Sequence, residues 1–397
     1  MRKFLWGFLA RIVNLFVPVK SKHWVFASDY GNMYRESAKY LFEYMLAEHP
    51  DYSCTYIVAK RKVYDEIASK GYPVAMNFSF KGIIAIAKAD VVFTTQTAHD
   101  MLYAFKKRHR RYYYLNHGQS LKRQMAALTD DYKKSLGGSK GMVLAFKQFV
   151  HNFFISNISI KDSEFISANS EFFIPFLKSS YGESMDIKML GMPRNDALFR
   201  HEEMNKEKWL EGMEGKFIIT YMPTHRKYGK GALTPTPFAN RPDVQKWMRE
   251  HNCILLMKQH PNMASKLKEE DDTDVIVDIT NRGLDPQVII YHSDALISDF
   301  SSVWLDYLLL RRPLITYIYD DFENDDAGLN IDIRKDTPGH LCYSEEELFQ
   351  TLKQIKDNYE EMKPTEENVR KFYKYADGEA SFRYYQEISS IEDRRSR

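Results

Sequence analysis

Cysteine is scarce in this sequence, which has three cysteines among its 397 residues. Cys54, Cys253 and Cys342 lie far apart and lack the spacing of metal ligands. Two of them, Cys54 and Cys253, fall inside apolar runs that resemble strands. We therefore interpret all three as free thiols of a protein that resides in a reducing compartment.

A strong excess of one charge is also absent. The formal net charge at pH 7 is +2, so we do not expect the chain as a whole to bind a polyanion such as nucleic acid. Two local basic clusters stand out, "KKRHRR" at 106–111 and "RKYGKG" at 226–231, and solvated loops are the default interpretation of both. The composition is that of an ordinary folded protein, and the length suits two domains.

No hydrophobic run is long enough to cross a membrane. The apolar pattern at the N-terminus is broken by Arg11 and stops at Pro18, short of the roughly 20 residues that a span needs. A secretory signal is possible in principle, but no small-residue cleavage site precedes Lys20, and "HWVFAS" at 23–28 resembles a first core strand. The apolar residues at helical spacing are Phe4, Leu5, Phe8, Leu9, Ile12, Val13 and Phe16.

Two interpretations of this helical stripe remain. It could lie in the interface of an anionic membrane, or it could pack on the protein's own core. The first is favoured because cations surround the stripe, and we expect residues 1–22 to form an amphipathic membrane-surface helix. These cations are Arg2, Lys3, Arg11, Lys20 and Lys22.

Several catalytic signatures are missing as well. The sequence contains no Walker loop, no dinucleotide GxGxxG, no GxSxG elbow and no paired acidic metal motif. These absences argue against an NTPase, a Rossmann oxidoreductase and a serine hydrolase. We expect neither a cofactor nor a metal, so that cationic side chains and a helix terminus stabilise the developing charge instead.

Short β-rich runs alternate with helical patterns, which is typical of parallel sheets connected by crossover helices. The alternation breaks near 196–215 and restarts, which predicts two α/β halves with a cleft between them and catalytic loops at the carboxyl ends of the strands. The predicted strands are 23–28, 54–59, 73–77, 91–95, 112–116, 166–169, 216–223, 253–260, 274–279, 295–300 and 314–319, and the predicted helices include 37–49, 80–89, 243–251, 285–292 and 301–312.

Four predicted strand ends share one pattern of polar residues. One histidine after a strand is more often structural than catalytic, and the segment "YYYLNHGQSLKR" at 112–123 could simply be a turn with a surface histidine. Polar strand ends in both halves nevertheless predict a catalytic site, with a base beside an anion-binding loop. These strand ends are His117-Gly118, Thr224-His225-Arg226, His260-Pro261 and Ser301-Ser302.

The segment "ISDFSSVWLDYLLL" predicts a phosphate site at the start of a helix. Ser301 or Ser302 is a natural N-cap, and hydroxyls beside unpaired helix N–H groups bind anions. Asp306 lies one turn deeper and could accept hydrogen bonds from sugar hydroxyls. The alternative is an ordinary capped helix with one acidic residue near its start.

Further cations are expected at the same phosphate site. Arg226 can contact two phosphate oxygens at once, whereas Lys258 supplies a point charge. His260 could donate a proton to a bridging or leaving-group oxygen. The alternative for "KQHPN" at 258–262 is a turn that ends a strand before proline.

The motifs together resemble those of the CDP-glycerol glycerophosphotransferase family, which includes teichoic acid primases and polymerases and related capsule enzymes. Each motif is weak alone, but the order and spacing are specific, and the resemblance runs from about Trp24 to residue 388. The motifs are "HGQSLK", "GMPRND", "YMPTHR", "KQHP", "ISDFSSVWLDY", "RRPLITYIYD", "DTPG" and "DGEAS".

The resemblance implies an α/β fold of glycosyltransferase type B architecture, with two Rossmann-like domains facing a central cleft. The first domain, 23–198, would lie on the acceptor side and carry the catalytic base. The second, 199–375, would bind the CDP-polyol, and 376–397 would form a C-terminal helix and charged tail. The implied reaction moves a polyol phosphate, glycerol phosphate above all, from a CDP-activated donor to an acceptor hydroxyl and releases CMP.

The resemblance also implies partners and residue roles. The acceptor would be a lipid-linked saccharide or a growing cell-surface polymer, and the protein would attach peripherally to the anionic surface at the cytoplasmic face of the cell membrane. His117 would take the acceptor proton, and His260 would help the departing CMP. The expected substrate-binding residues are Gly118, Gln119, Ser120, Lys122, Arg194, Thr224, His225, Arg226, Lys258, Ser301, Ser302 and Asp306.

The sequence departs from the family pattern at three places. Gln119 and Ser120 replace a Thr-Pro pair, Lys258 stands where arginine is usual, and "DDAGLNID" at 325–332 lacks an Arg-Gly pair. These departures leave the polyol and the acceptor open. Two other functions remain, a nucleotide-sugar glycosyltransferase of the same architecture and a non-catalytic polymer- or lipid-binding homologue, although the latter would be expected to lack a catalytic histidine.

Overall fold

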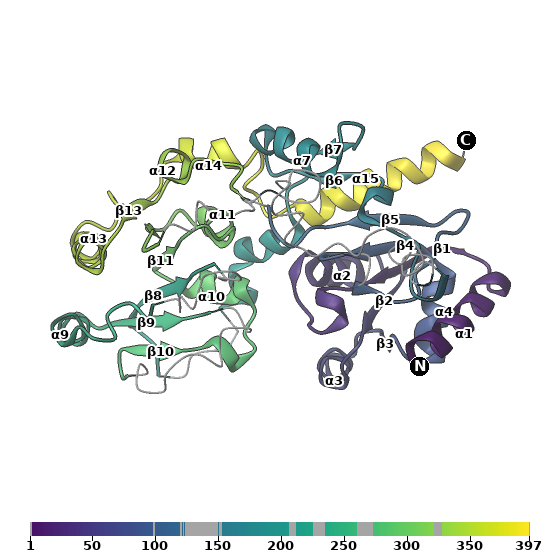
Figure 1. The fold of residues 1–397 in the computed structure, drawn as a ribbon, viewed down its shortest axis with the longest axis horizontal. Helices are drawn as coiled ribbons and strands as arrows, with labels where there is room; N and C mark the ends of the chain where they lie inside the picture. Colours follow the sequence, from purple (N-terminus) through teal and green to yellow (C-terminus); the bar gives the residue numbers. More distant parts are fainter. Residues whose placement is uncertain are drawn as a thin grey trace. The chain divides into compact units, whose positions relative to one another are not determined.

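The computed structural model divides the chain into two compact units, each with its own parallel sheet (Figure 1). The first unit comprises Met1–Gly118, Met125–Asp196 and Asp377–Arg397, and the second comprises Gln119–Gln124 and Ala197–Ala376. The structure describes residues 2–97, 100–119, 121, 123, 150, 153–205, 212–224, 235–259, 273–320 and 328–396.

The first unit contains a five-stranded parallel sheet in the order β3-β2-β1-β4-β5. The order reverses between β1 and β4, and ligands of open α/β sheets bind beyond the carboxyl ends of the strands at such a switch point. The strands are β1 (Lys20–Phe26), β2 (Ser53–Val58), β3 (Val74–Met76), β4 (Ala89–Thr94) and β5 (Arg111–Tyr114).

The two faces of this sheet carry different residues because neighbouring side chains on a strand point to opposite sides. One face bears the aromatic rings of Trp24, Phe26 and Tyr56, which pack in a single core cluster with residues of three helices. These helices are α2 (Glu36–Glu48), α3 (Arg61–Ser69) and α15 (Ala380–Ser396). The C-terminal helix α15 thus completes the core of the first unit.

The helices α4 (Phe80–Lys88) and α1 (Arg2–Phe16) pack against each other and form a second cluster. Ala10 of α1 and Ile83 of α4 are buried in this cluster together with Tyr103 and Phe105. Close packing also requires Gly7, because a Cβ atom there would lie 1.8 Å from a backbone oxygen of Phe154. The inner face of α1 is therefore part of the protein core.

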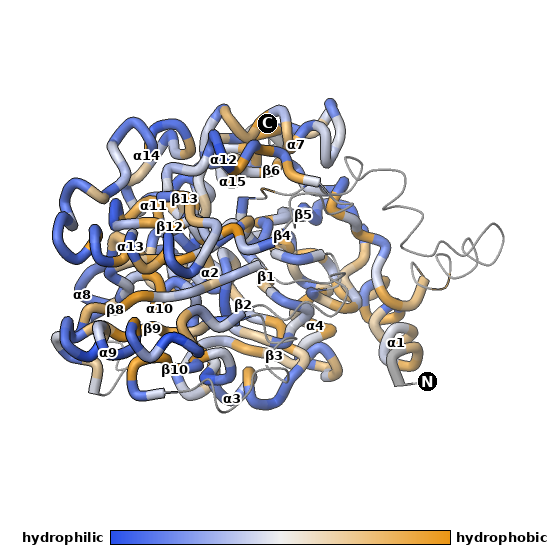
Figure 2. The backbone as a smooth tube through the Cα atoms, turned by 60° about the vertical axis from the view of Figure 1, so that its left-hand side comes forward, coloured by the Kyte–Doolittle hydropathy of each residue, from blue (hydrophilic) through white to orange (hydrophobic). Residues whose placement is uncertain are grey.

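The outer face of α1 is apolar as well, and Figure 2 shows hydrophobic residues along this helix. Leu5 is 60% exposed, Phe8 51%, Leu15 79% and Phe16 81%. One face of the N-terminal stripe therefore packs on the protein and the other faces solvent, and attachment of the outer face to a membrane stays a prediction. Within the described ranges, no helix is long and apolar enough to span a membrane.

The second unit contains a six-stranded parallel sheet in the order β10-β9-β8-β11-β12-β13. Its core consists of apolar strand residues such as Leu255 and Ile297, packed with Val244 from α9 (Pro242–Glu250) and Leu352 from α13 (Glu345–Asp357). The strands are β8 (Phe217–Met222), β9 (Cys253–Met257), β10 (Ile276–Asp278), β11 (Ala295–Ser298), β12 (Leu314–Tyr317) and β13 (His340–Cys342).

Two helices of the second unit begin at residues whose side chains cap the first turn. Ser344 accepts a hydrogen bond from the Glu347 backbone at the start of α13, and Thr365 forms a capping box with Asn368 at the start of α14. The helices of this unit are α8 (His201–Met204), α9 (Pro242–Glu250), α10 (Pro286–His292), α11 (Val303–Leu308), α12 (Ile333–Asp336), α13 (Glu345–Asp357) and α14 (Glu366–Phe372).

Smaller elements of the first unit connect its sheet to the second half of the chain. The short strands β6 (Ile166–Ser167) and β7 (Ile187–Lys188) pair in parallel, and α7 (Ile174–Tyr181) lies between them in sequence. A 3-10 segment, Pro193–Phe199, follows and carries Arg194 and Asp196. Asp196 accepts hydrogen bonds from the backbone of Ala380 and Ser381, which anchors the start of α15.

Candidate active site

The loop that carries His117 begins where β5 ends, at the carboxyl edge of the first sheet. Asn116 has a φ of 60°, and its side-chain oxygen accepts a hydrogen bond from the His117 backbone at 2.8 Å. Gly118 has a φ of 135°, which residues with a side chain rarely adopt. The conformation of this loop therefore depends on an asparagine and a glycine on either side of the histidine.

Arg194 holds this loop in place from the 3-10 segment. Its Nη1 donates a hydrogen bond to Glu36 Oε2 at 2.6 Å and another to the backbone oxygen of His117 at 2.8 Å. Only 9% of the Arg194 side chain and 13% of the Glu36 side chain are exposed. Two charges that are this well shielded are stable only as a pair, so the ion pair fixes the position of His117.

The environment of His117 favours its neutral form. Burial lowers the pKa of the imidazole below its ordinary value of 6.5, and the nearby guanidinium of Arg194 lowers it further. The carboxylates of Glu36 and Asp29 and a hydrogen bond with the Thr95 backbone oppose this shift. A neutral imidazole can accept a proton, and the buried Nδ1 atom has no hydrogen-bond partner among the described residues.

Backbone strain gathers around the same edge of the sheet. Asp29, Tyr30 and Glu36, which follow β1, have positive φ angles, as does Asn116 after β5. Each such residue costs about 1–3 kcal/mol and persists only where its surroundings hold it. Asp100 supplies part of this support, because its carboxylate accepts hydrogen bonds from the backbone of Tyr30, Thr95 and Gln96.

In the second unit, Thr224 and Asp299 meet at the carboxyl edge of the sheet. Thr224 follows β8, Asp299 follows β11, and these two strands are neighbours. Asp299 Oδ1 accepts hydrogen bonds from the Thr224 backbone at 2.8 Å and from its hydroxyl at 2.6 Å. Asp299 is fully buried. The predicted ligand residue Thr224 is thus held by a carboxylate that sequence reasoning did not single out.

Lys258 lies directly after β9 and is half-buried. Its ammonium group donates to the backbone oxygen of Thr280 at 3.2 Å. The following residue, Gln259, is buried, and its backbone donates to the Thr280 hydroxyl at 2.9 Å. These contacts connect the end of β9 to the segment after β10. The role of Lys258 in ligand binding stays a prediction.

The serine pair before α11 is partly exposed, whereas Asp306 is buried. Ser302 occupies the N-cap position, but its side chain accepts no capping hydrogen bond, and Ser301 Oγ accepts a long hydrogen bond, 3.4 Å, from the Val303 backbone. Asp306 accepts a hydrogen bond from Gln287 Nε2 at 3.2 Å. The role of all three in substrate binding stays a prediction.

Of the remaining predicted site residues, the structure describes Gln119 and Gly118. Gln119 is buried and belongs to the second unit, and its neighbour Leu121 accepts a hydrogen bond from the Asn330 backbone there. Gly118 lies beside His117 in the first unit. Five further predicted residues lie outside the described part of the chain, namely Ser120, Lys122, His225, Arg226 and His260.

Curated relatives of this chain include a transferase, a polymerase and a primase that are named for teichoic acid. A teichoic acid glycerol-phosphate transferase of Staphylococcus aureus is 26% identical, covering 91% of this chain and 92% of that protein. A teichoic acid poly(glycerol phosphate) polymerase of Bacillus subtilis is also 26% identical, covering 85% of this chain but only 44% of the polymerase. A teichoic acid glycerol-phosphate primase of the same organism is 28% identical, with 55% of each protein covered.

Solved structures share the fold. The wall teichoic acid polymerase TagF, in a structure with CDPG, has a TM-score of 0.79 at 21% identity, covering 100% of this chain and 95% of that chain. A UDP-N-acetylglucosamine 2-epimerase of Listeria monocytogenes has a TM-score of 0.56 at 13% identity, covering 94% and 98%. These likenesses confirm the predicted α/β fold with parallel sheets, which is of the glycosyltransferase type B kind found in TagF.

The family model described as CDP-Glycerol:Poly(glycerophosphate) glycerophosphotransferase matches residues 9–390. This match spans both units and includes every site residue discussed above. The chain therefore belongs to the CDP-glycerol glycerophosphotransferase family.

Proposed function

We propose that this protein transfers glycerol phosphate from CDP-glycerol to a hydroxyl group of a lipid-linked saccharide or a growing cell-surface polymer and releases CMP. Family membership and the glycerol-phosphate transferase of Staphylococcus aureus, which this chain matches over nearly its full length, support this reaction. The observation that carries the proposal is the position of His117, which the Arg194–Glu36 ion pair holds at the carboxyl edge of the first sheet, where burial lowers the pKa of its imidazole.

In the proposed mechanism, His117 acts as the general base. A ring nitrogen takes the proton of the acceptor hydroxyl, and the resulting oxygen attacks the phosphorus that bears glycerol. The bond between this phosphorus and the bridging oxygen breaks, and the electron pair leaves with CMP. Because charge spreads over the phosphoryl oxygens in the transition state, positioning and electrostatics are expected to supply most of the acceleration.

The polar strand ends of the second unit are proposed to bind the donor. The hydroxyl of Thr224 is oriented by Asp299, and the partly exposed Ser301 and Ser302 add two hydroxyls at the adjacent strand end. Hydroxyl and backbone N–H groups of this kind bind phosphate oxygens without a glycine-rich loop. His260 and Arg226 are proposed to stabilise the departing CMP, as their positions in the family motifs imply.

The outer face of α1 is proposed to attach the protein to the cytoplasmic face of the cell membrane. This face exposes Leu5, Phe8, Leu15 and Phe16 although its inner face is already packed. Apolar side chains of a surface helix enter the boundary between lipid head groups and acyl chains, and each one that becomes buried contributes about 1.5–3 kcal/mol. Such attachment would bring the enzyme to a lipid-linked acceptor.

A donor screen tests the proposed reaction. The full-length protein is incubated with a lipid-linked acceptor and, separately, with CDP-glycerol, CDP-ribitol and nucleotide-sugars, while free nucleotide and product mass are measured. The expected result is CMP release with CDP-glycerol and a product heavier by one or more glycerol phosphate units. Release of nucleotide from a nucleotide-sugar instead would identify the protein as a glycosyltransferase.

A further inference from the structure

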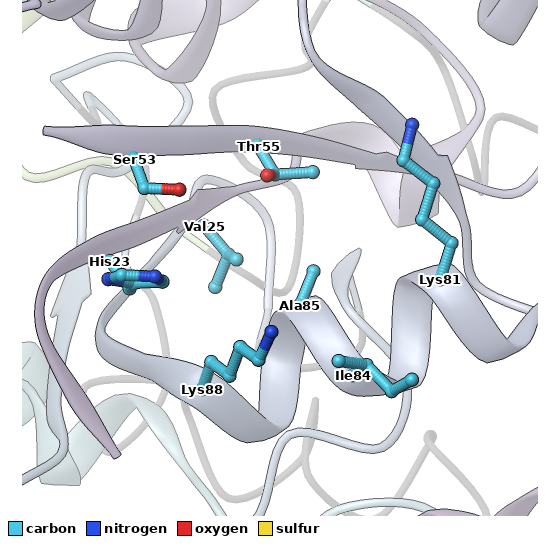
Figure 3. A pocket seen from close by; sticks show the side chains of 8 residues that line it. All are labelled: His23, Val25, Ser53, Thr55, Lys81, Ile84, Ala85 and Lys88. Carbon is cyan, nitrogen blue, oxygen red and sulfur yellow. The ribbon is translucent and has the colours of Figure 1, made fainter. Parts of the chain in front are cut away.

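A second candidate binding site lies in the first unit, away from the edge that carries His117. It is a pocket of about 300 Å³ between the sheet and α4 (Figure 3). Ser53, the first residue of β2, and His23 of β1 line it. Because all strands of the sheet are parallel, the pocket lies towards their amino ends, whereas His117 follows the carboxyl end of β5.

The sheet register explains the strand side of the pocket. His23 lies beside Ser53 and Val25 beside Thr55, and residues two apart on a strand point to the same face. The four side chains therefore form a two-by-two group on the face of the sheet opposite to the aromatic core cluster. The small side chains of Ser53, Thr55 and Val25 leave the space that Figure 3 shows between sheet and helix.

The helix side of the pocket is one stripe of α4. Lys81, Ala85 and Lys88 recur at spacings of four and three residues and so lie on the same face of the helix. Ala85 adds no bulk between the two lysines. In Figure 3 the side chain of Lys88 extends into the space in front of Val25, and Lys81 rises towards the sheet.

The charge of the pocket is one-sided. None of the eight described residues that line it is acidic, and neither Lys81 nor Lys88 forms an ion pair with any residue that the structure describes. Lys88 is half-buried, and the attraction between an ammonium group and an anion strengthens where water is partly excluded. The hydroxyls of Ser53 and Thr55 add hydrogen-bond donors, so the lining suits a phosphate group.

The surroundings of the pocket indicate where such a phosphate comes from. Phe80, directly before Lys81, is 60% exposed, and Ile84 at the pocket is 36% exposed. The ring of Phe80 lies 5.5 Å from that of Trp6, a half-buried residue, so apolar side chains continue from the pocket onto α1. A phosphate that is covalently attached to acyl chains would contact both surfaces at once.

We propose that this pocket binds the phosphate head group of an anionic phospholipid while its acyl chains lie along Phe80, Ile84 and the outer face of α1. The inference rests on the membrane attachment proposed above and adds a head-group site to it. The site differs from a general attraction to negative surfaces, because it depends on the space between Lys81 and Lys88 as well as on their charge.

The test is sedimentation of the full-length protein with vesicles of equal parts phosphatidylcholine and phosphatidylglycerol. Lys81→Gln and Lys88→Gln should each weaken binding by about fivefold, the contribution of one lysine near an anionic surface. Ala85→Leu, which fills the pocket and keeps the charge, should also weaken binding. Lys62→Gln is the matched control, since Lys62 is an exposed lysine on α3, which packs on the other face of the sheet.

The possible outcomes of the vesicle experiment distinguish a head-group site from a general attraction to negative surfaces and from a site for a soluble anion. Equal losses for Lys62→Gln and Lys88→Gln, or unchanged binding of Ala85→Leu, would overturn the head-group site. Displacement of the protein from vesicles by soluble glycerol phosphate or inorganic phosphate at millimolar concentration would show that the pocket takes a free anion or a polymer phosphate instead. If substitutions on the outer face of α1 also leave vesicle binding unchanged, the membrane attachment itself fails, whereas CMP release reports separately on the transferase.

Discussion

The guanidinium of Arg194 lies 2.6 Å from the carboxylate of Glu36, and the same nitrogen donates to the backbone oxygen of His117. Glu36 begins α2 and is separated from Arg194 by 158 positions in sequence. One ion pair therefore connects the loop after β1, the 3-10 segment and the loop of the proposed base. Its effect on catalysis and on stability can be measured separately.

Removal of either partner should lower both activity and stability. Arg194→Met leaves the Glu36 carboxylate shielded without its partner, and loss of one member of a buried pair typically costs about 3–5 kcal/mol. We expect kcat to fall more than KM rises, because the donor strand ends of the second unit are unchanged. Urea unfolding and steady-state kinetics measure the two effects.

The control for this variant is Arg249→Gln. Arg249 forms an ion pair with Asp274, but both side chains are about half exposed, at 47% and 61%. Such pairs contribute about 0–1 kcal/mol. A loss in Arg249→Gln equal to that in Arg194→Met would contradict a special role for the Arg194–Glu36 pair.

The pH dependence of catalysis should report on His117. Because burial and Arg194 lower the pKa of its imidazole, the acidic limb of kcat/KM should lie below pH 6.5. Removing the guanidinium in Arg194→Met should move this limb to higher pH. Removing the carboxylate in Glu36→Gln, which raises the pKa, should move it to lower pH.

If the acidic limb moves in opposite directions in the two variants, the effect on the base is electrostatic. Structural damage would not be expected to move the limb to higher pH in one variant and to lower pH in the other. His251→Gln is the control, since the ring of His251 contacts the Trp247 backbone in the second unit. This variant should leave the acidic limb of kcat/KM at the same pH as in wild type. Identical limbs in wild type, Arg194→Met and Glu36→Gln would count against His117 as the titrating group.

Donor binding should depend on the contact between Thr224 and Asp299. Thr224→Val keeps the shape of the side chain but leaves Asp299 without the hydroxyl that it accepts from at 2.6 Å. Asp299 Oδ1 keeps the hydrogen bond from the Thr224 backbone but loses the one from the hydroxyl, and a hydrogen bond to a charged group typically contributes about 1.5–3 kcal/mol. We expect the Kd for CDP-glycerol, measured by calorimetry, to rise by about tenfold.

Thr316→Val is the control in the same sheet. The hydroxyl of Thr316 forms a hydrogen bond with that of Thr337 at 2.9 Å. Thr316 lies within β12 and is not one of the residues proposed to bind the donor. An equal rise of the donor Kd in both variants would mean that the sheet as a whole, and not the Thr224 strand end, determines binding.

Membrane attachment should depend on the outer face of α1. The double variant Phe8→Ser, Leu15→Ser removes two exposed apolar side chains and leaves the inner residues that pack against α4 unchanged. We expect vesicle binding to fall at least tenfold, since each buried apolar side chain contributes about 1.5–3 kcal/mol. Phe382→Ser, at a phenylalanine on α15 that is 40% exposed, should bind as wild type does.

The parallel sheets were predictable from the sequence because buried strands alternate with amphipathic helices. Two strands were not predicted, β7 and β13, which have two and three residues and are partly exposed. Such short segments carry no hydrophobic periodicity, and pairing with a neighbour decides whether they form strands.

The candidate site was predictable only where local sequence carries a signal. His117-Gly118 and Thr224 follow apolar strands, so their place at a carboxyl edge could be expected. Glu36 lies at the start of a helix, and Asp299 falls within the predicted strand 295–300, so neither residue carries a local signal of a site. Their importance comes from partners far away in sequence, which a single sequence does not show.

His117 is proposed to take the proton of the acceptor hydroxyl. The most direct measurement is CMP release from CDP-glycerol in the presence of a lipid-linked acceptor by wild type and by His117→Gln. The predicted result is a loss of about 10²–10³ in kcat with unchanged donor affinity, as expected for one missing acid–base group. Near-normal CMP release by a folded His117→Gln variant would show that His117 is not the general base.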